Sequence, residues 1–263
     1  MPPRSIWSGS ISFGLVNVPV KLTTAVSPKD VRFNQLHDAD GARISQKRVC
    51  SLDGEEVPYE NIVKGYEVAP NQYVIIDPAE LSTIDPKATH SIDIEEFVDL
   101  DQIDPLYFEH AYYLVPDTRA EKPYALLVEA MRRSNKVAIA RMVLRTKGYL
   151  AALRPVEGAL VLSTLYYGDE VKDVQELEGL PGADVELSDK EIAMAEQLIE
   201  SLAAKFDPDK FHDEYREQVM ELIEQKAAGM EIVAQPVTEA PAAVVDLMAA
   251  LEASLAEAKS KKG

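Results

Sequence analysis

A cluster of basic side chains between residues 119 and 154 is the part of this sequence with the clearest potential for chemistry. The segment RAEKPYALLVEAMRRSNKVAIARMVLRTKGYLAALR contains nine lysines and arginines but only two acids, Glu121 and Glu129, so it carries a charge of +7. The whole chain carries −18, which leaves −25 on the remaining residues. A basic island in an acidic chain indicates a local binding site for an anion, and a phosphate backbone is the anion that fits best.

The second half of this segment, residues 137–146, alternates in a way that predicts a β-strand. Arg141, Arg145 and Lys147 share one parity, so we expect them to project from the same face. Strand geometry spaces them about 6–7 Å apart for every two residues, which can follow a sugar-phosphate chain. The alternative is a strand whose arginines face water or pair with the many carboxylates, and charge alone favours this second interpretation.

Signals for catalysis and for metal binding are missing from the sequence. It contains no GxGxxG, GK[ST], GxSxG or HExxH motif, and its four histidines are scattered without metal-ligand spacing. The single cysteine, Cys50, excludes an intrachain disulfide, and Asp53 stands where a zinc ribbon would need its second cysteine. We therefore expect no catalytic residue, no metal site and no cofactor.

The elements that position the basic segment are mainly short strands separated by turn residues. The N-terminal strand pattern changes parity between Leu15 and Val16, and Gly14, Asn17 and Pro19 suit a bulge or bend there. Further strands are expected at residues 72–76, 92–100, 107–115 and 159–167, and Pro123 begins a helix that runs to Arg133. Many short strands with one helix favour a closed or strongly curved sheet.

The character of the chain changes to helical after Gly182. Ser188 and Glu191 form a capping-box pattern that begins a helix of about 17 residues, and a second helix is expected over residues 210–228. The second helix would bury the apolar residues Phe211, Tyr215, Val219, Leu222 and Ile223. Residues 186–225 hold twelve acids and four basic residues, so this region is not expected to face DNA.

A linker at residues 235–241 precedes a last amphipathic helix, residues 244–258. Its apolar stripe has to pack either on the core of this chain or in the groove of a partner, and the sequence does not separate the two. The stripe consists of Val244, Leu247, Met248, Leu251 and Leu255. No run approaches the 18 apolar residues of a membrane span and no secretion signal is present, so we expect a cytoplasmic protein.

Several motifs of this chain resemble those of the bacterial Ku proteins of non-homologous DNA end joining. The resemblance rests on the segments Trp7–Leu22 (WSGSISFGLVNVPVKL), Gly54–Glu67 (GEEVPYENIVKGYE), Tyr112–Pro116 (YYLVP), Val143–Leu150 (VLRTKGYL) and Asp213–Arg216 (DEYR). These segments lie within residues 1–229, and the first two are long enough to be specific.

The resemblance implies a mixed α/β fold with a Ku-like β-barrel core, a bridging arm and a C-terminal helical region. Residues 1–229 would form the core, with barrel and bridge in about 1–182 and a helical arm in about 183–229. Residues 230–241 would be a linker, and 242–263 a helix with a short basic tail. Two copies would form a ring that threads onto a double-stranded DNA end.

The resemblance also implies that the chain is not an enzyme and that it recruits an ATP-dependent DNA ligase through residues 242–263, acting at breaks in the bacterial nucleoid. A ring retains DNA by its topology, so only the inner surface has to be basic. We predict that this surface consists of Arg132, Arg133, Lys136, Arg141, Arg145, Lys147 and Arg154, with Arg43, Lys47 and Arg48 as secondary candidates.

Two other classes of function compete with this prediction. A metal-free enzyme that uses one of the many carboxylate pairs has no motif to support it. A barrel-type protein that binds RNA or single strands would rely on exposed aromatic side chains for stacking, and the basic segment offers only Tyr124 and Tyr149.

Overall fold

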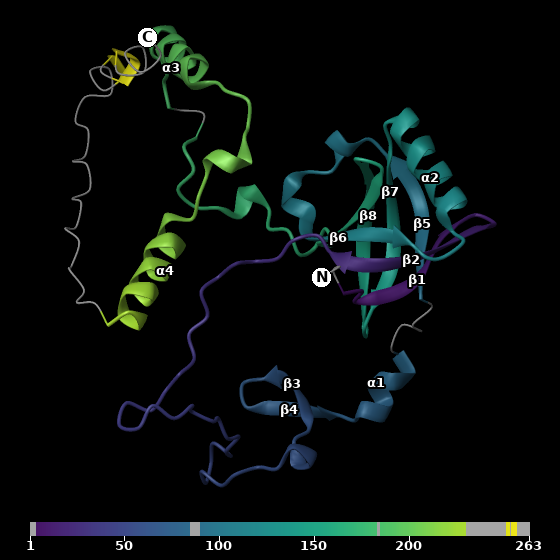
Figure 1. Ribbon diagram of the computed structural model, residues 1–263, viewed down its shortest axis with the longest axis vertical. Coiled ribbons are helices and arrows are strands. Elements are labelled where there is room, and N and C mark those ends of the chain that lie inside the picture. The colour runs from purple at the N-terminus through teal and green to yellow at the C-terminus, as the bar shows by residue number, and fades with distance from the viewer. Residues whose placement is uncertain (1–3, 85–89, 183–184, 230–250, 253, 257–263) are drawn as a thin grey trace. The chain divides into compact units, whose positions relative to one another are not determined.

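The structure is a computed structural model that describes residues 4–84, 90–182, 185–229, 251–252 and 254–256 (Figure 1). The chain divides into two units. The first consists of Met1–Lys29 and Asn34–Asp173, and the second consists of Asp30–Phe33 and Val174–Gly263. The candidate basic residues all lie in the first unit.

Seven strands of the first unit form a closed barrel, so the predicted barrel core and the mixed α/β class are confirmed (Figure 1). The order around the barrel is β1-β2-β6-β9-β8-β7-β5. All neighbours are antiparallel except β1 and β5, whose parallel pairing closes the barrel. The barrel strands are β1 (Trp7–Phe13), β2 (Val16–Thr24), β5 (Ser91–Val98), β6 (Phe108–Pro116), β7 (Val137–Leu144), β8 (Lys147–Val156) and β9 (Ala159–Leu165).

Alternating side chains of the strands fill the barrel interior. Large residues such as Leu153, Leu160 and Leu162 are fully buried in one core cluster, together with the small residues Ala140 and Ala151 of β7 and β8. Small side chains on two neighbouring strands leave volume inside the barrel, and this volume admits side chains of a helix.

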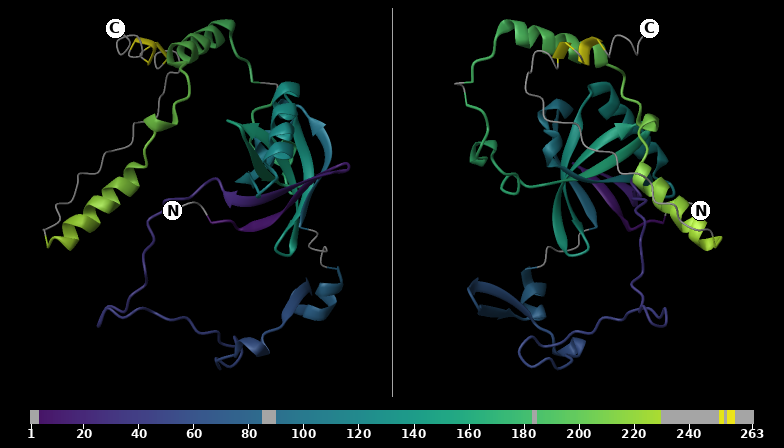
Figure 2. Two further views of the ribbon diagram at one scale, coloured as in Figure 1. Left: turned by 45° about the vertical axis from the view of Figure 1, so that its right-hand side comes forward. Right: turned by 90° about the vertical axis from the view of Figure 1, so that its left-hand side faces the viewer.

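That helix is α2 (Glu121–Ser134), and it presents the predicted apolar side to the core. Tyr124, Leu127, Val128 and Met131 are buried and belong to the same cluster as the barrel residues. The Tyr124 hydroxyl donates a hydrogen bond to the Leu114 carbonyl (2.6 Å) and accepts one from the Leu160 amide (2.7 Å). These two bonds connect α2 to β6 and β9, and Figure 2 shows the helix against the barrel from two further directions.

The N-terminal strand pattern proves to be a hairpin, so the predicted bulge or bend is wrong. β1 and β2 pair through Phe13 and Val16, and Gly14 and Leu15 form a two-residue turn with a φ of 59° at Gly14. Two residues that flank such a turn lie on the same face, although their positions differ in parity. A change of parity in the sequence is therefore what this hairpin produces.

The segment between β2 and β5 forms a small arm with sparse secondary structure. Strands β3 (Lys64–Ala69) and β4 (Gln72–Ile76) pair as a two-stranded sheet, and helix α1 (Pro78–Ile84) follows. Asn71 has a φ of 62° in the turn between the two strands, a backbone conformation that asparagine tolerates. The apolar side chains Tyr66, Val74 and Ile75 of this sheet are exposed.

The second unit contains α3 (Asp189–Leu202) and α4 (Glu214–Ala227), neither of which buries a residue in the single chain. The predicted capping box of α3 is present, since the Ser188 hydroxyl accepts from the Glu191 amide while the Glu191 carboxylate accepts from the Ser188 amide. The second helix begins later than predicted because the Asp213 carboxylate caps it through the Arg216 amide. The predicted burial of its apolar side is wrong for this chain alone, since Phe211, Tyr215, Leu222 and Ile223 are exposed and Val219 is half-buried.

Candidate nucleic-acid interface

The predicted strand over residues 137–146 is in fact the end of β7 and a turn. Leu144 pairs with Lys147, and Arg145 and Thr146 form the two-residue loop between β7 and β8. Arg145 has a φ of 60°, which is strained for a residue with a side chain and costs about 1 kcal/mol or somewhat more. Arg145 thus lies at the tip of a hairpin and not on the face of a strand.

The turn also separates Arg141 from Lys147, which were predicted to share a face with Arg145. Ala140 and Met142 of β7 point into the core, so Arg141 points outward. On β8, Tyr149 and Ala151 belong to the inward set, and Lys147 shares their parity. Arg141 and Lys147 therefore lie on opposite faces of the barrel wall, and the prediction of one shared face is wrong.

Four of the cations predicted within the basic segment form ion pairs with carboxylates, as the alternative interpretation of that segment proposed. Arg132 and Arg133 on α2 both contact Glu129, at 2.8 and 2.6 Å. Lys136 contacts Asp99 at 2.8 Å, and Arg141 contacts Glu95 at 2.7 Å. Exposed pairs of this kind contribute little to stability, about 0–1 kcal/mol, and such cations can exchange a carboxylate for a phosphate at small cost.

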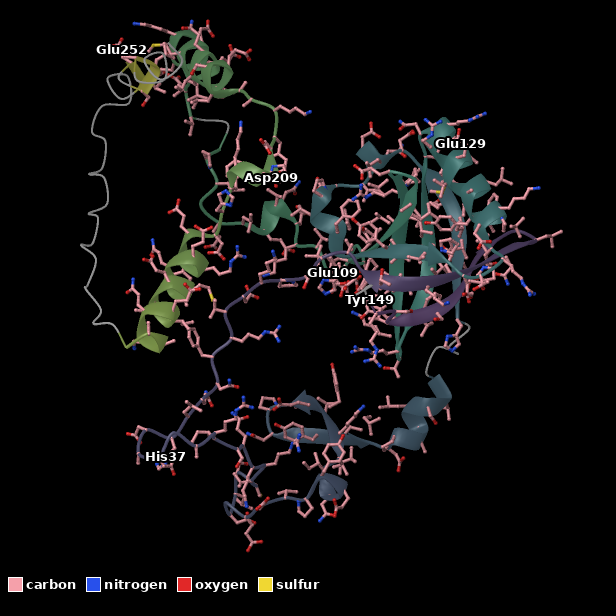
Figure 3. All side chains as sticks on the ribbon, viewed as in Figure 1. His37, Glu109, Glu129, Tyr149, Asp209 and Glu252 are labelled. Carbon is pink, nitrogen blue, oxygen red and sulfur yellow. The ribbon has the colours of Figure 1, made fainter. Side chains whose placement is uncertain are left out.

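The pair of arginines has a marked effect on Glu129. Hydrogen bonds from Arg132 and then Arg133 lower the pKa of the Glu129 carboxyl to about 2, and the same contact raises the pKa of Arg132. Glu129 therefore stays ionised at any physiological pH. The C-terminal part of α2, where Figure 3 labels Glu129, therefore carries less free positive charge than its sequence indicates.

The end of the barrel away from α2 holds cations of a different kind. Within the described part of the chain, neither Arg145 nor Lys147 forms an ion pair. The Lys147 ammonium lies 5.0 Å from the centre of the Tyr149 ring, a cation–π contact. Tyr112 is also at this end, where burial raises its pKa, the nearby Tyr149 and Glu109 add to the rise and Arg145 opposes it.

We call Tyr112, Arg145, Lys147 and Tyr149 the barrel mouth. Its two cations were predicted from the sequence, but their approach to Tyr112 was not, because β6 and β8 are not neighbours in the barrel. The motifs Tyr112–Pro116 and Val143–Leu150, which contain the two tyrosines, were the only sequence features that could have indicated this cluster. Figure 3 shows Tyr149 on the barrel, far along it from Glu129 on α2.

The secondary candidates lie on the arm and take part in its local structure. The Lys47 ammonium contacts Glu56 at 2.6 Å, and the Arg48 guanidinium lies 5.3 Å from the centre of the Tyr59 ring. Arg43 pairs through its backbone with Leu36 in an isolated bridge. All three residues lie on the arm, and their assignment to DNA binding stays a prediction.

The remaining predicted site residues lie elsewhere. Arg154 is half-buried on the outer face of β8, in the wall of a cavity described below. Leu251 and Leu255 are half-buried and helical, whereas Val244, Leu247 and Met248 lie outside the described residues.

Comparison with known proteins places this barrel in a family. The family model described as the Ku70/Ku80 beta-barrel domain matches residues 12–194 of the chain. The chain belongs to the Ku family. The match covers all of the barrel except the start of β1, and it extends into α3.

Relatives of this Ku-family chain match it over nearly its whole length. The non-homologous end joining protein Ku of Anaeromyxobacter sp. (strain K) is 54% identical over 98% of this chain and 87% of its own length. The protein of the same name from Koribacter versatilis is 45% identical over 98% of this chain and 88% of its own. The one from the archaeon Archaeoglobus fulgidus is 43% identical over 97% of this chain and 100% of its own.

The described residues contain neither a cluster of metal-ligating side chains nor a membrane-spanning helix. No group of three or more histidine, cysteine or acidic side chains has an arrangement that fits a metal ion in the described part of this Ku-family chain. Among the helices that the structure describes, none has the length and hydropathy needed to cross a membrane.

Proposed function

We propose that two copies of this chain form a ring that binds double-stranded DNA ends, without sequence preference, in non-homologous end joining. The observation that carries the proposal is the match over nearly the full chain with relatives named as non-homologous end joining proteins. A barrel whose mouth presents unpaired cations supports it, because contacts to the phosphate backbone require free positive charge and no base readout.

The second unit supports a dimer. α3 and α4 bury no residue in one chain, and Phe206 and Phe211 stack on each other with ring centroids 6.0 Å apart while both remain exposed. Exposed apolar side chains on helices that bury nothing in their own chain favour a protein partner. In the proposed ring, a second copy covers these faces and two barrel mouths contribute to one lining.

The cations are proposed to contribute to DNA binding in two groups. Arg145 and Lys147 contact phosphates directly, because they have no carboxylate partner among the described residues. Arg132, Arg133 and Arg141 contact DNA after exchanging their carboxylates for phosphates. Lys136 and Arg154 remain predictions for DNA contact, and Arg43, Lys47 and Arg48 remain secondary predictions.

Salt dependence and competition test the DNA-binding part. The logarithm of the affinity for a short duplex should fall linearly with the logarithm of salt concentration, with a slope near −0.9 for each phosphate contacted. Single strands of the same length should compete poorly. A flat salt profile would remove the phosphate backbone from the proposal, and efficient competition by single strands would favour the barrel-type single-strand binder.

The proposal includes recruitment and stimulation of an ATP-dependent DNA ligase by residues 242–263. A chain that ends after Gln235 should bind DNA ends with unchanged affinity but no longer stimulate the ligase. If the shortened chain stimulates the ligase as well as the full chain does, the C-terminal helix packs on its own core instead.

A further inference from the structure

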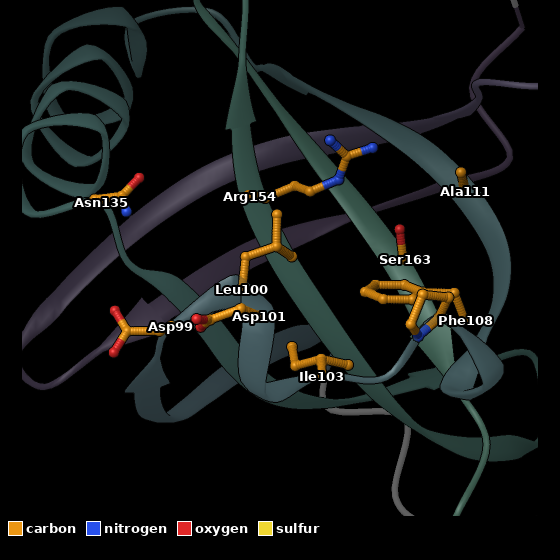
Figure 4. A pocket seen from close by; sticks show the side chains of 10 residues that line it. Asp99, Leu100, Asp101, Ile103, Phe108, Ala111, Asn135, Arg154 and Ser163 are labelled. Carbon is orange, nitrogen blue, oxygen red and sulfur yellow. The ribbon is translucent and has the colours of Figure 1, made fainter. Parts of the chain in front are cut away.

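A cavity of about 860 Å³ lies on the outer face of the barrel, and the DNA-binding proposal does not involve it. It opens between the segment that connects β5 to β6 and the outward sides of β6, β8 and β9 (Figure 4). A volume of this size is in the range of small-molecule sites, about 300–1,000 Å³.

The wall of the cavity is a connecting segment held in a fixed shape. It forms 3-10 turns at Leu100–Gln102 and Pro105–Tyr107, each capped by an aspartate at its start, Asp99 and Asp104. The ion pair of Lys136 with Asp99 connects the start of this segment to the residue that precedes β7. This contact gives Lys136 a role in positioning the cavity wall.

The cavity floor is apolar and includes an aromatic ring. Leu100, Ile103, Pro105, Phe108 and Ala111 line it. Figure 4 shows Phe108 on one side of the cavity, and Leu100 and Ile103 of the connecting segment on another. Such a floor favours a ligand with a flat apolar body.

Two polar groups at the cavity have no partner in the described part of the chain. Ser163 is 5% exposed, and its hydroxyl forms no hydrogen bond with a described residue. Arg154 reaches from β8 toward the side of the cavity that Ser163 and Phe108 line, and no described carboxylate pairs with it (Figure 4). The Ser163 hydroxyl is therefore available to a ligand, and a guanidinium on the neighbouring strand fits a bound carboxylate.

We propose that this cavity is a binding site for a small aromatic carboxylate. Its ring packs on Phe108 and the apolar floor, and its carboxylate accepts hydrogen bonds from the Arg154 guanidinium and the Ser163 hydroxyl. The inference does not depend on DNA binding or on the dimer, since every residue involved belongs to one barrel.

The test uses the full chain and two matched probes, naphthalene-1-acetate and its neutral amide, naphthalene-1-acetamide. Titration calorimetry should show saturable binding of the acid and affinity lower by about tenfold or more for the amide, because a hydrogen bond to a charged group is lost. The Arg154→Ala variant should bind the acid with an affinity lower by a similar factor, and Ser163→Ala should lower this affinity by a few fold. Ala111→Leu should abolish binding by filling the cavity.

The control variant Arg32→Ala removes an exposed arginine outside the cavity and should leave binding of the acid unchanged. Thermal unfolding shows which variants remain folded, and if Arg154→Ala does not fold, Ser163→Ala and Ala111→Leu decide the test. The inference is overturned by absence of saturable binding, by equal affinity for acid and amide, or by unchanged affinity in the folded cavity variants. A loss of DNA-end binding in Arg154→Ala with unchanged binding of the acid would assign Arg154 to DNA instead.

Discussion

The two ends of the barrel differ in how their charged side chains are paired. One end is closed by α2, whose Tyr124 forms two buried hydrogen bonds and whose arginines are paired with Glu129. The other end is the barrel mouth, where Arg145 and Lys147 have no carboxylate partner among the described residues. The comparison shows that the count of basic residues in a segment does not locate its free positive charge. We expect the closed end to determine stability and the mouth to determine binding.

The largest effect should come from reversing the charge at the mouth. The double variant Arg145→Glu, Lys147→Glu should weaken binding to a short duplex by about a hundredfold or more, because two phosphate contacts in each protomer become repulsive. Fluorescence anisotropy measures the affinity. Neutral substitutions to alanine remove four cations from the proposed two-chain ring, so they should lower the salt slope by about 4, and the melting temperature should stay unchanged. Wild-type affinity in the charge-reversed variant would remove the mouth from the DNA interface.

The opposite effect is expected at the closed end. Tyr124→Phe removes the hydroxyl and leaves the buried Leu160 amide and Leu114 carbonyl unpaired, at about 1–3 kcal/mol for each group. Denaturant unfolding should therefore show a loss of about 2–6 kcal/mol, while the folded fraction binds duplex with nearly normal affinity. A larger effect on affinity than on stability would contradict the division of tasks between the two ends.

The ion pairs of α2 provide a smaller test on binding. Glu129→Gln releases Arg132 and Arg133 from their carboxylate, and if these arginines reach DNA the affinity should rise by about two- to fivefold. Glu121→Gln changes the net charge of the chain equally, on the same helix but without releasing an arginine pair, and is the matched control. Equal gains in both variants would mean that only the overall charge matters.

Arg145, at the hairpin tip, allows the cost of its backbone conformation to be separated from its contribution to DNA binding. Arg145→Gly places a residue without a Cβ at a φ of 60°, so the free energy of unfolding should rise by about 1 kcal/mol or less. The same substitution removes a cation and should weaken binding to DNA. A variant that is neither more stable nor weaker in binding would contradict both roles given to Arg145.

The smallest expected effect is a loss of stability at low pH through the ion pairs of Glu129. The pKa of Glu129 is lowered to about 2, so its ion pairs stabilise the protein above the ordinary pKa of an unfolded glutamate, about 4.3. That contribution is lost as the pH falls from there toward 2. Carbon-detected NMR should find the Glu129 midpoint near 2 in the native protein and nearer its ordinary value in Arg132→Ala, Arg133→Ala. An ordinary midpoint in the native protein would mean that the pairs do not persist in solution.

The sequence predicted the barrel and α2 because their signals are local. The apolar side of α2 repeats with helical period, and the predicted four residues are the ones that it buries. Gln72–Ile76 was predicted with the bounds of β4. The capping box at Ser188 located the start of α3, since both of its hydrogen bonds lie within four residues.

The turns between β1 and β2 and between β7 and β8 were not predicted from the sequence, and the physical reason is the same for both. A two-residue turn places its flanking residues on one face, so the parity of the inward residues changes across it. At Gly14 this change was visible and was interpreted as a bend. At Arg145 it was hidden, because Val137, Ile139 and Val143 are apolar although they lie on the outward parity of β7.

Contacts between distant segments account for the rest of the site. Nothing near Lys136 or Arg141 in the sequence indicates Asp99 or Glu95 as partners, because the pairing of β5 with β7 brings them together. The approach of Tyr112 to Arg145 and the cavity beside Arg154 likewise depend on closure of the barrel.

Binding to a linear duplex, compared with the same duplex closed into a covalent circle, is the most direct test of the central proposal. In a gel-shift titration at physiological salt, the account predicts binding to the linear form alone, because a closed ring loads only over an end. The charge-reversed mouth variant should bind neither form. Equal binding of the wild-type chain to the linear duplex and the circle would show an open groove and contradict the proposed ring.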